Sequence, residues 1–89
     1  MAEKTFFEIF AEEAPDISKT FGGLYHCVKD TCGLDEKTWE LVYIALKASS
    51  CSAHAVAVHA GFAKNAGATP DEVRGAIFLF LTSFFRPAC

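Results

Sequence analysis

The segment from Gly67 to Glu72, Gly-Ala-Thr-Pro-Asp-Glu, constrains the fold of this chain more than any other stretch. Glycine commonly ends a helix because it adopts left-handed backbone angles without a steric penalty. Thr69 followed three residues later by Glu72 is a capping box, and proline is favoured at the first position of a helix. The segment therefore predicts that one helix ends and another begins within a few residues.

Helical periodicity extends over the rest of the chain, and no useful stretch alternates polar and apolar residues as a strand does. Asp16 and Asp35 are the expected N-caps of earlier helices, and Gly22-Gly23 predicts a kink or a close helix contact. Trp39, Val42, Ala45, and Ile44 or Tyr43, are the expected buried residues of the third helix. The expected fold is all-α with five helices: residues 4–13, 16–31, 35–48, 52–65, and a last helix from residue 70 that ends at Arg86-Pro87.

The length of 89 residues predicts one domain, residues 1–89. So short a chain buries only about 60–65% of its unfolded surface, yet 52% of its residues are hydrophobic and nine are Phe. The last helix is apolar nearly all round, which predicts burial on more than one side. This excess of apolar side chains predicts a homo-oligomer, since a large exposed apolar patch usually marks an interface.

Charge and hydropathy exclude several classes of partner. A net charge of −3 and the lack of a basic block argue against nucleic acid. The apolar run from residue 76 to residue 85 is far shorter than the ~20 residues that a membrane helix needs. The first ten residues do not have the pattern of a signal peptide, so we expect a cytoplasmic protein whose four cysteines are thiols.

Candidate chemistry lies between the third and fourth expected helices. Cys51 is expected at a helix N-terminus, where free N–H groups stabilise a thiolate. His54 is about 60° from Cys51 around the helix and one turn along, so the two side chains can interact. His59 is about 140° from His54, so both histidines cannot face one pocket. Glu40, one helix earlier, can reach His59 if the two helices pack antiparallel.

Glu40, His59 and the turn Gly67-Ala68-Thr69 together resemble the carboxymuconolactone decarboxylase-like family, which includes alkylhydroperoxidase D. That family has a Glu, then Cys-x-x-Cys, then a His four residues after the second Cys, then Gly-Ala-Thr eight residues later. On this spacing the two cysteine positions fall on Ser52 and Ala55, and Cys51 lies one residue early. Over residues 14–85 the resemblance implies an alkylhydroperoxidase D-like helical bundle, assembled as dimers or trimers of dimers.

The resemblance implies thiol-based antioxidant activity of the peroxiredoxin or alkylhydroperoxidase kind, on a peroxide or a small thiol or disulfide, without a cofactor or metal. Cys51 would be the nucleophile, and Glu40 with His59 or His54 the proton relay. A sulfenic acid at Cys51 would be resolved by an external thiol, by Cys27 or Cys32, or by a neighbouring subunit. The turn favours His59 over His54 as the relay, and predicts that His59 points to Glu40.

Other interpretations remain open at this point. Glu40 and His59 could perform acid–base work on a small carboxylated lactone, as in the decarboxylase branch. The chain could equally be a helical oligomer without catalysis, in which Cys51 is an inert thiol and Glu40 and His59 form a structural pair. Cys51 and His54 could also supply two of the four ligands that a closed zinc site needs, with His26 or Cys27 adding more.

Overall fold

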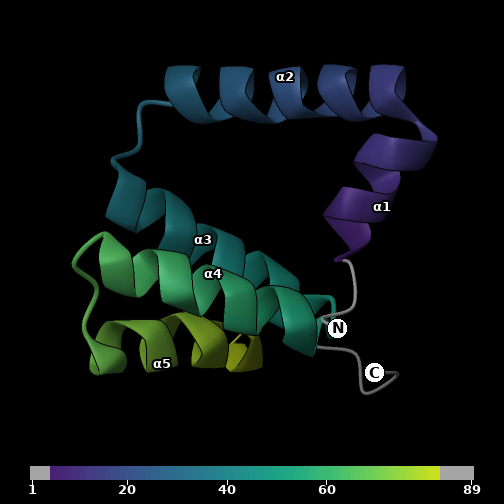
Figure 1. Ribbon diagram of the computed structural model, residues 1–89. Helices are drawn as coiled ribbons and strands as arrows, with labels where there is room; N and C mark the ends of the chain where they lie inside the picture. The colour runs from purple at the N-terminus through teal and green to yellow at the C-terminus, as the bar shows by residue number, and fades with distance from the viewer. Residues whose placement is uncertain (1–4, 83–89) are drawn as a thin grey trace. The chain divides into compact units, whose positions relative to one another are not determined.

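The computed structural model describes residues 5–82, apart from the side chain of Phe80, and every regular element in that range is helical. The expected all-α fold with five helices is confirmed (Figure 1). The chain divides between Gly33 and Leu34 into two compact units. The elements are α1 (Phe6–Glu13) and α2 (Pro15–Thr31) in the first unit, then α3 (Glu36–Ser49), α4 (Ala53–Asn65), α5 (Pro70–Phe78) and the 3₁₀ helix η1 (Leu79–Thr82) in the second.

The two helices of the first unit begin differently from what the sequence predicts. Thr5 caps α1 in a capping box: the Glu8 amide donates to its hydroxyl at 3.2 Å, and its own amide donates to the Glu8 carboxylate at 3.3 Å. Pro15 occupies the first position of α2, and Ala14 is its N-cap. The expected cap at Asp16 is therefore wrong, because proline at the first helical position places Asp16 inside the helix.

Helix α2 continues without interruption through Gly22 and Gly23. A β-carbon at either glycine would meet no other heavy atom within 4 Å, so neither glycine makes a close contact with α1, the other helix of this unit. Neither α1 nor α2 contains a buried residue. A stripe along α2 is about half exposed or more, and it consists of Ile17, Phe21, Leu24 and Val28.

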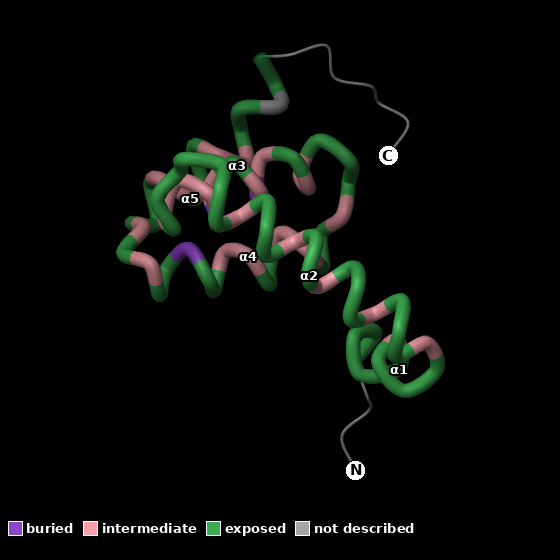
Figure 2. The backbone as a smooth tube through the Cα atoms, turned by 90° about the horizontal axis from the view of Figure 1, so that it is seen from above, coloured by how far each residue is buried: buried purple, intermediate pink, exposed green. Residues whose placement is uncertain are grey.

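In the second unit, α3 packs against both α4 and α5, and the buried residues lie on α3 and α4 (Figures 1 and 2). The core is small: among the apolar residues described, Ile44 and Ala63 are fully buried. Val42 is 52% exposed, so its expected burial is wrong. Ile44, which the sequence offered with Tyr43 as an alternative buried residue, is fully buried.

The junction between α4 and α5 forms as the sequence predicts. Gly67 has a φ of +96°, the left-handed region that favours glycine. Its amide donates to the Lys64 carbonyl at 3.0 Å and the Ala68 amide donates to the Ala63 carbonyl at 2.9 Å, which closes a Schellman motif. The Glu72 amide then donates to the Thr69 hydroxyl at 3.1 Å, and the Thr69 amide donates to the Glu72 carboxylate at 2.9 Å.

Replacing Thr69 with Ala is expected to lower the free energy of unfolding by about 1 kcal/mol, because the Glu72 amide loses its acceptor at the start of α5. Urea unfolding followed by circular dichroism measures the change. Thr69→Ser is the matched control, since serine keeps the hydroxyl and should retain most of the stability. Equal stability of the Ala and Ser variants would show that the capping bond contributes nothing.

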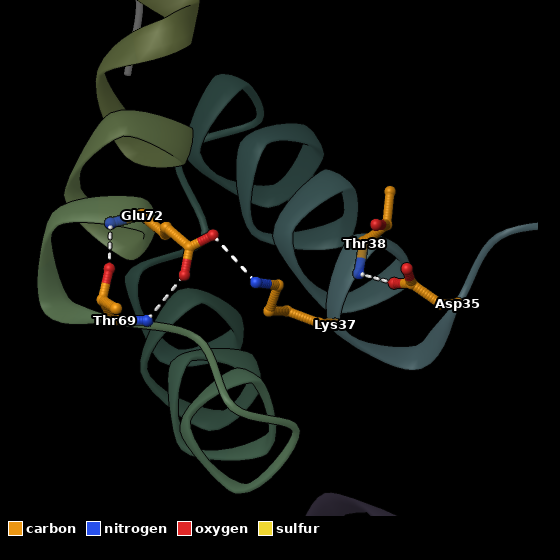
Figure 3. A network of polar contacts seen from close by, with 5 residues as sticks. All are labelled: Asp35, Lys37, Thr38, Thr69 and Glu72. Atoms are coloured by element: carbon orange, nitrogen blue, oxygen red, sulfur yellow. Dashed lines mark hydrogen bonds and ion pairs between the residues drawn. The ribbon is translucent and has the colours of Figure 1, made fainter.

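A polar network joins the beginnings of α3 and α5 (Figure 3). The Lys37 ammonium lies 3.0 Å from the Glu72 carboxylate, and the Thr38 amide donates to Asp35 at 2.7 Å. The bond from the Thr69 amide, aided by Lys37, lowers the pKa of Glu72 below its ordinary 4.5. The bond from the Thr38 amide lowers the pKa of Asp35 below its ordinary 3.8. Each carboxylate is thus stabilised in its charged form by a backbone amide at the start of its helix.

These two shifts predict how stability depends on pH. A carboxyl group whose pKa is lower in the folded state stabilises the fold above its unfolded pKa, and this contribution is lost as the pH falls through the folded value. Stability should therefore decrease from about pH 4.5 downward. In the double variant Asp35→Asn/Glu72→Gln the decrease over this window should be shallower. Parallel profiles of unfolding midpoint against pH for the two proteins would contradict the assignment.

The end of α5 differs from the long last helix that the sequence predicts. The α-helix ends at Phe78 and tightens into the 3₁₀ turn η1, while Arg86 and Pro87 lie outside the described residues. Phe78, Leu79 and Leu81 are each more than half exposed. Burial of this apolar segment on several sides is therefore not achieved within the described part of the chain.

Candidate active site

The most deeply buried polar contact in the described residues joins α3 to α4. The Nδ1 atom of His59 lies 2.7 Å from the Oε2 atom of Glu40. The Glu40 residue is 1% exposed and the His59 side chain 12%. Charged groups are rarely buried without a partner, because their desolvation is costly. The prediction that His59 points to Glu40 is confirmed.

The hydrogen bond determines which atom of His59 remains available. An ionised carboxylate can only accept, so Nδ1 carries the proton that Glu40 receives in the bond. In a neutral imidazole the second nitrogen, Nε2, is then unprotonated and can act as a base. The pair therefore has the parts of a proton relay: a carboxylate that orients the ring, and a ring nitrogen that can take up or release a proton.

Two aromatic rings surround the imidazole of His59. The Tyr43 ring stacks on it with centroids 4.0 Å apart and planes at 23°. The Phe62 ring meets it at 87°, with centroids 5.4 Å apart. Sequence reasoning did not assign either ring to the site. The signal was present in the helical spacing, because Tyr43 follows Glu40 by three residues and Phe62 follows His59 by three.

A comparison with protein-family models matches residues 15–81 to the carboxymuconolactone decarboxylase family. The chain belongs to the carboxymuconolactone decarboxylase family. Comparisons with curated proteins and with solved structures found no match. The matched residues run from α2 to η1 and include both Glu40 and His59, so the family assignment covers the whole buried pair.

The cysteine positions of the carboxymuconolactone decarboxylase motif hold no thiol in this chain. Ser52 is the N-cap residue of α4 and makes no capping hydrogen bond with its side chain, and Ala55 is half-buried in the first turn. Ser52, Ala55 and His59 share one face of the helix by their spacing. The face that carries the paired cysteines in the resembled proteins therefore carries a hydroxyl and a methyl group here.

Cys51 lies in the turn between α3 and α4, outside the helix. Its φ of +62° is unusual for a residue with a side chain, and Ser52 separates it from the first residue of α4. The expectation that Cys51 sits at the helix terminus is wrong, so helical spacing does not fix its position relative to His54. Cys51 is disulfide-bonded, whereas Cys27 and Cys32 are exposed thiols, and Cys89 lies outside the described residues. The expectation of thiols therefore holds for Cys27 and Cys32 and is wrong for Cys51.

His54 is the second residue of α4 and is exposed, in contrast to His59. Within residues 5–82 no three His, Cys, Asp or Glu side chains come close enough together to hold a metal ion. Cys51 and His54 lie in the second unit, and His26 and Cys27 lie in the first, so the zinc site considered from them stays a prediction. Across the same range, no helix combines the length and apolarity required to cross a bilayer.

Proposed function

We propose that this protein is a thiol-based antioxidant of the alkylhydroperoxidase kind, in which Glu40 and His59 form the proton relay and Cys51 is the redox thiol. The observation that carries the proposal is the 2.7 Å contact between the buried Glu40 carboxylate and His59 Nδ1. Membership of the carboxymuconolactone decarboxylase family supports it, because that family contains both alkylhydroperoxidase-like and decarboxylase-like proteins.

In the proposed reaction, His59 Nε2 accepts the proton of the Cys51 thiol, and Glu40 stabilises the imidazolium that forms. The thiolate attacks the terminal oxygen of a hydroperoxide, the O–O bond breaks, and the departing alkoxide takes the proton back from His59. Cys51 becomes a sulfenic acid. A second thiol then displaces water to form a disulfide, and an external dithiol reduces that disulfide to restore Cys51.

The state of Cys51 in the structure supports this cycle. Its disulfide is the product that a resolving thiol would leave, so the side chain is accessible to a second sulfur. Cys51 is also exposed in the turn between α3 and α4. Burial is the usual condition of inert structural cysteines, so an exposed turn position favours the redox role.

A second candidate function is acid–base catalysis on a small carboxylated lactone, without any thiol. The observation that favours it is that Ser52 and Ala55 occupy the two positions at which the family motif has cysteines. Here His59 Nε2 alone would move the proton and Glu40 would orient the ring. A third reading, an oligomer that kept the pair for stability only, predicts no turnover of either substrate.

One assay series separates these functions. We expect the wild type to reduce cumene hydroperoxide with dithiothreitol as the electron donor, and Cys51→Ser to lose this turnover. His59→Gln should lower kcat by about 10²–10⁴-fold, whereas His54→Gln, at an exposed position of the same helix, should change it little. Full peroxide turnover in Cys51→Ser would refute the thiol mechanism. Release of carbon dioxide from a carboxylated γ-lactone by Cys51→Ser would establish the second function.

The proposed state of assembly is a homo-oligomer. Large apolar side chains are about half exposed or more on α3 and α4 as well as on α2, among them Val42, Leu46 and Phe62. A soluble protein of this size seldom leaves so many in water unless another surface covers them. The match to the carboxymuconolactone decarboxylase family runs through both compact units, which supports treating residues 1–89 as one domain of that oligomer.

A further inference from the structure

We propose that Tyr43 is a positioning residue for proton transfer: its ring fixes the plane of the His59 imidazole, so that Nε2 alone is presented to the reacting group. The inference deepens the proposed function and rests on it for its catalytic part. Its structural part stands on the contacts of His59 alone. No feature of the sequence motif assigns this role to position 43.

The hydrogen bond to Glu40 leaves the tilt of the His59 ring partly undetermined. A single hydrogen bond of 2.7 Å from Nδ1 fixes one atom of the imidazole. Small coupled rotations about the Cα–Cβ and Cβ–Cγ bonds can still tilt the ring, and they change the direction in which Nε2 points. A proton relay needs that direction fixed, because transfer is efficient only within about 2.6–3.2 Å of the donor or acceptor.

The stack supplies the missing constraint. Tyr43 lies nearly parallel to the imidazole at 23°, with the centroids 4.0 Å apart, so turning the imidazole out of its plane would drive it into the Tyr43 ring. Phe62, at 87° to the same ring, limits its sliding. A fixed atom and a fixed plane together determine where Nε2 points. Glu40 and Tyr43 are three residues apart, so one face of α3 provides both constraints.

Tyr43 is itself held in place along α3. The Lys47 ammonium, one turn later, lies 5.6 Å from the centroid of the Tyr43 ring, within the range of a cation–π contact. The Trp39 ring, one turn earlier, lies 6.1 Å away. A ring that orients a reacting group is effective only if its own rotamer is fixed by neighbours. Both neighbours of Tyr43 come from the same rigid helix, which meets this condition.

The experiment compares Tyr43→Phe, which keeps the ring, with Tyr43→Leu, which removes it. Nitrogen-15 spectra of the imidazole report which nitrogen carries the proton. In the wild type and in Tyr43→Phe we expect one tautomer with the proton on Nδ1, and upfield ring-current shifts of the carbon-bound His59 protons. In Tyr43→Leu the tautomer should be unchanged, because Glu40 still accepts from Nδ1, but the order parameter of the His59 Cε1–H bond, measured by carbon-13 relaxation, should fall. In the peroxide assay the kcat of Tyr43→Leu should fall about 10–100-fold, because a small misplacement of His59 Nε2 slows proton transfer. Its KM should stay within twofold of the wild-type value.

An unchanged order parameter of the His59 Cε1–H bond in a folded Tyr43→Leu would overturn the proposal, whatever its turnover. If that variant does not fold, the wild type still decides: a proton on Nε2, or no upfield shift of the His59 ring protons, would overturn the proposal equally. A wild type that reduces no hydroperoxide would refute the proposed function alone, since the spectra test the positioning role without any assay of activity.

Discussion

Replacing Glu40 with Ala is expected to lower the free energy of unfolding by about 1–3 kcal/mol, the cost of leaving a buried hydrogen-bonding group without its partner. The Glu40 residue is 1% exposed, and its carboxylate holds His59 Nδ1 at 2.7 Å. Without the Glu40 carboxylate, the Nδ1–H group of His59 stays buried between α3 and α4 and loses that hydrogen-bond acceptor. A domain of this length has a total stability of roughly 5–13 kcal/mol, so the variant should unfold at a far lower urea concentration.

The control for this prediction replaces both partners. In Glu40→Leu/His59→Phe the carboxylate and the imidazole give way to apolar side chains of similar size, and the loss should be much smaller, since such replacements of buried pairs are often neutral or stabilising. Chemical unfolding of both variants supplies the comparison. If Glu40→Ala alone is nearly as stable as the wild type, the pair is not as desolvated as its burial indicates.

The two variants also separate stability from function at one site. A buried pair that serves only to hold two helices together could be exchanged for an apolar pair with no effect beyond stability. A proton relay could not, because neither Leu nor Phe can move a proton. A stable Glu40→Leu/His59→Phe variant without peroxide turnover would therefore support the proposed function through a route independent of Cys51.

The parts of this structure that the sequence predicted are those that local physical chemistry determines. Gly67 and Thr69 formed the expected helix end and capping box, because each needs only a few neighbouring residues. The pairing of Glu40 with His59, 19 residues apart, was instead implied by the resemblance to the carboxymuconolactone decarboxylase-like family, whose spacings Glu40, His59 and Gly67 fit together.

Predictions failed where two local signals competed or where the backbone left the regular helix. Pro15 both ends one helical pattern and starts the next, and its place at the first position of α2 excluded a cap at Asp16. Cys51 adopted a left-handed backbone in the turn, so its distance from any histidine could not be deduced from helical spacing. The stack of Tyr43 on His59 needed the rotation of α3 against α4, which only tertiary packing sets.

The exposure of Val42 shows what hydrophobic periodicity cannot determine. Hydrophobic periodicity predicts that such a residue is buried, but periodicity does not say whether the covering surface belongs to the same chain. In this chain Val42 is 52% exposed and Ile44, two positions later, is fully buried. The apolar residues of α3 therefore divide between a core within the chain and a face that we assign to the oligomer.

Ile44→Ala is expected to cost about 2–5 kcal/mol, the range for truncating a fully buried Ile and leaving a cavity. Ile44 is the largest apolar side chain that is completely buried in the described residues. Its loss removes packing between α3 and its neighbours, where few other side chains can compensate. Urea unfolding measured at a single protein concentration gives the value. A loss below about 1 kcal/mol would mean that the core collapses around the shortened side chain.

Leu46→Ala on the same helix is the matched comparison, because Leu46 is 61% exposed within the chain. If nothing covers it, this substitution should change stability by no more than about 0.5 kcal/mol. If α3 faces a second copy, its cost should instead depend on concentration, since association stabilises the folded state by mass action. We expect that dependence, together with a lower sedimentation coefficient for Leu46→Glu. A folded wild-type monomer at micromolar concentration would contradict the assembly, and the exposed face of α3 would then be a feature of the isolated chain.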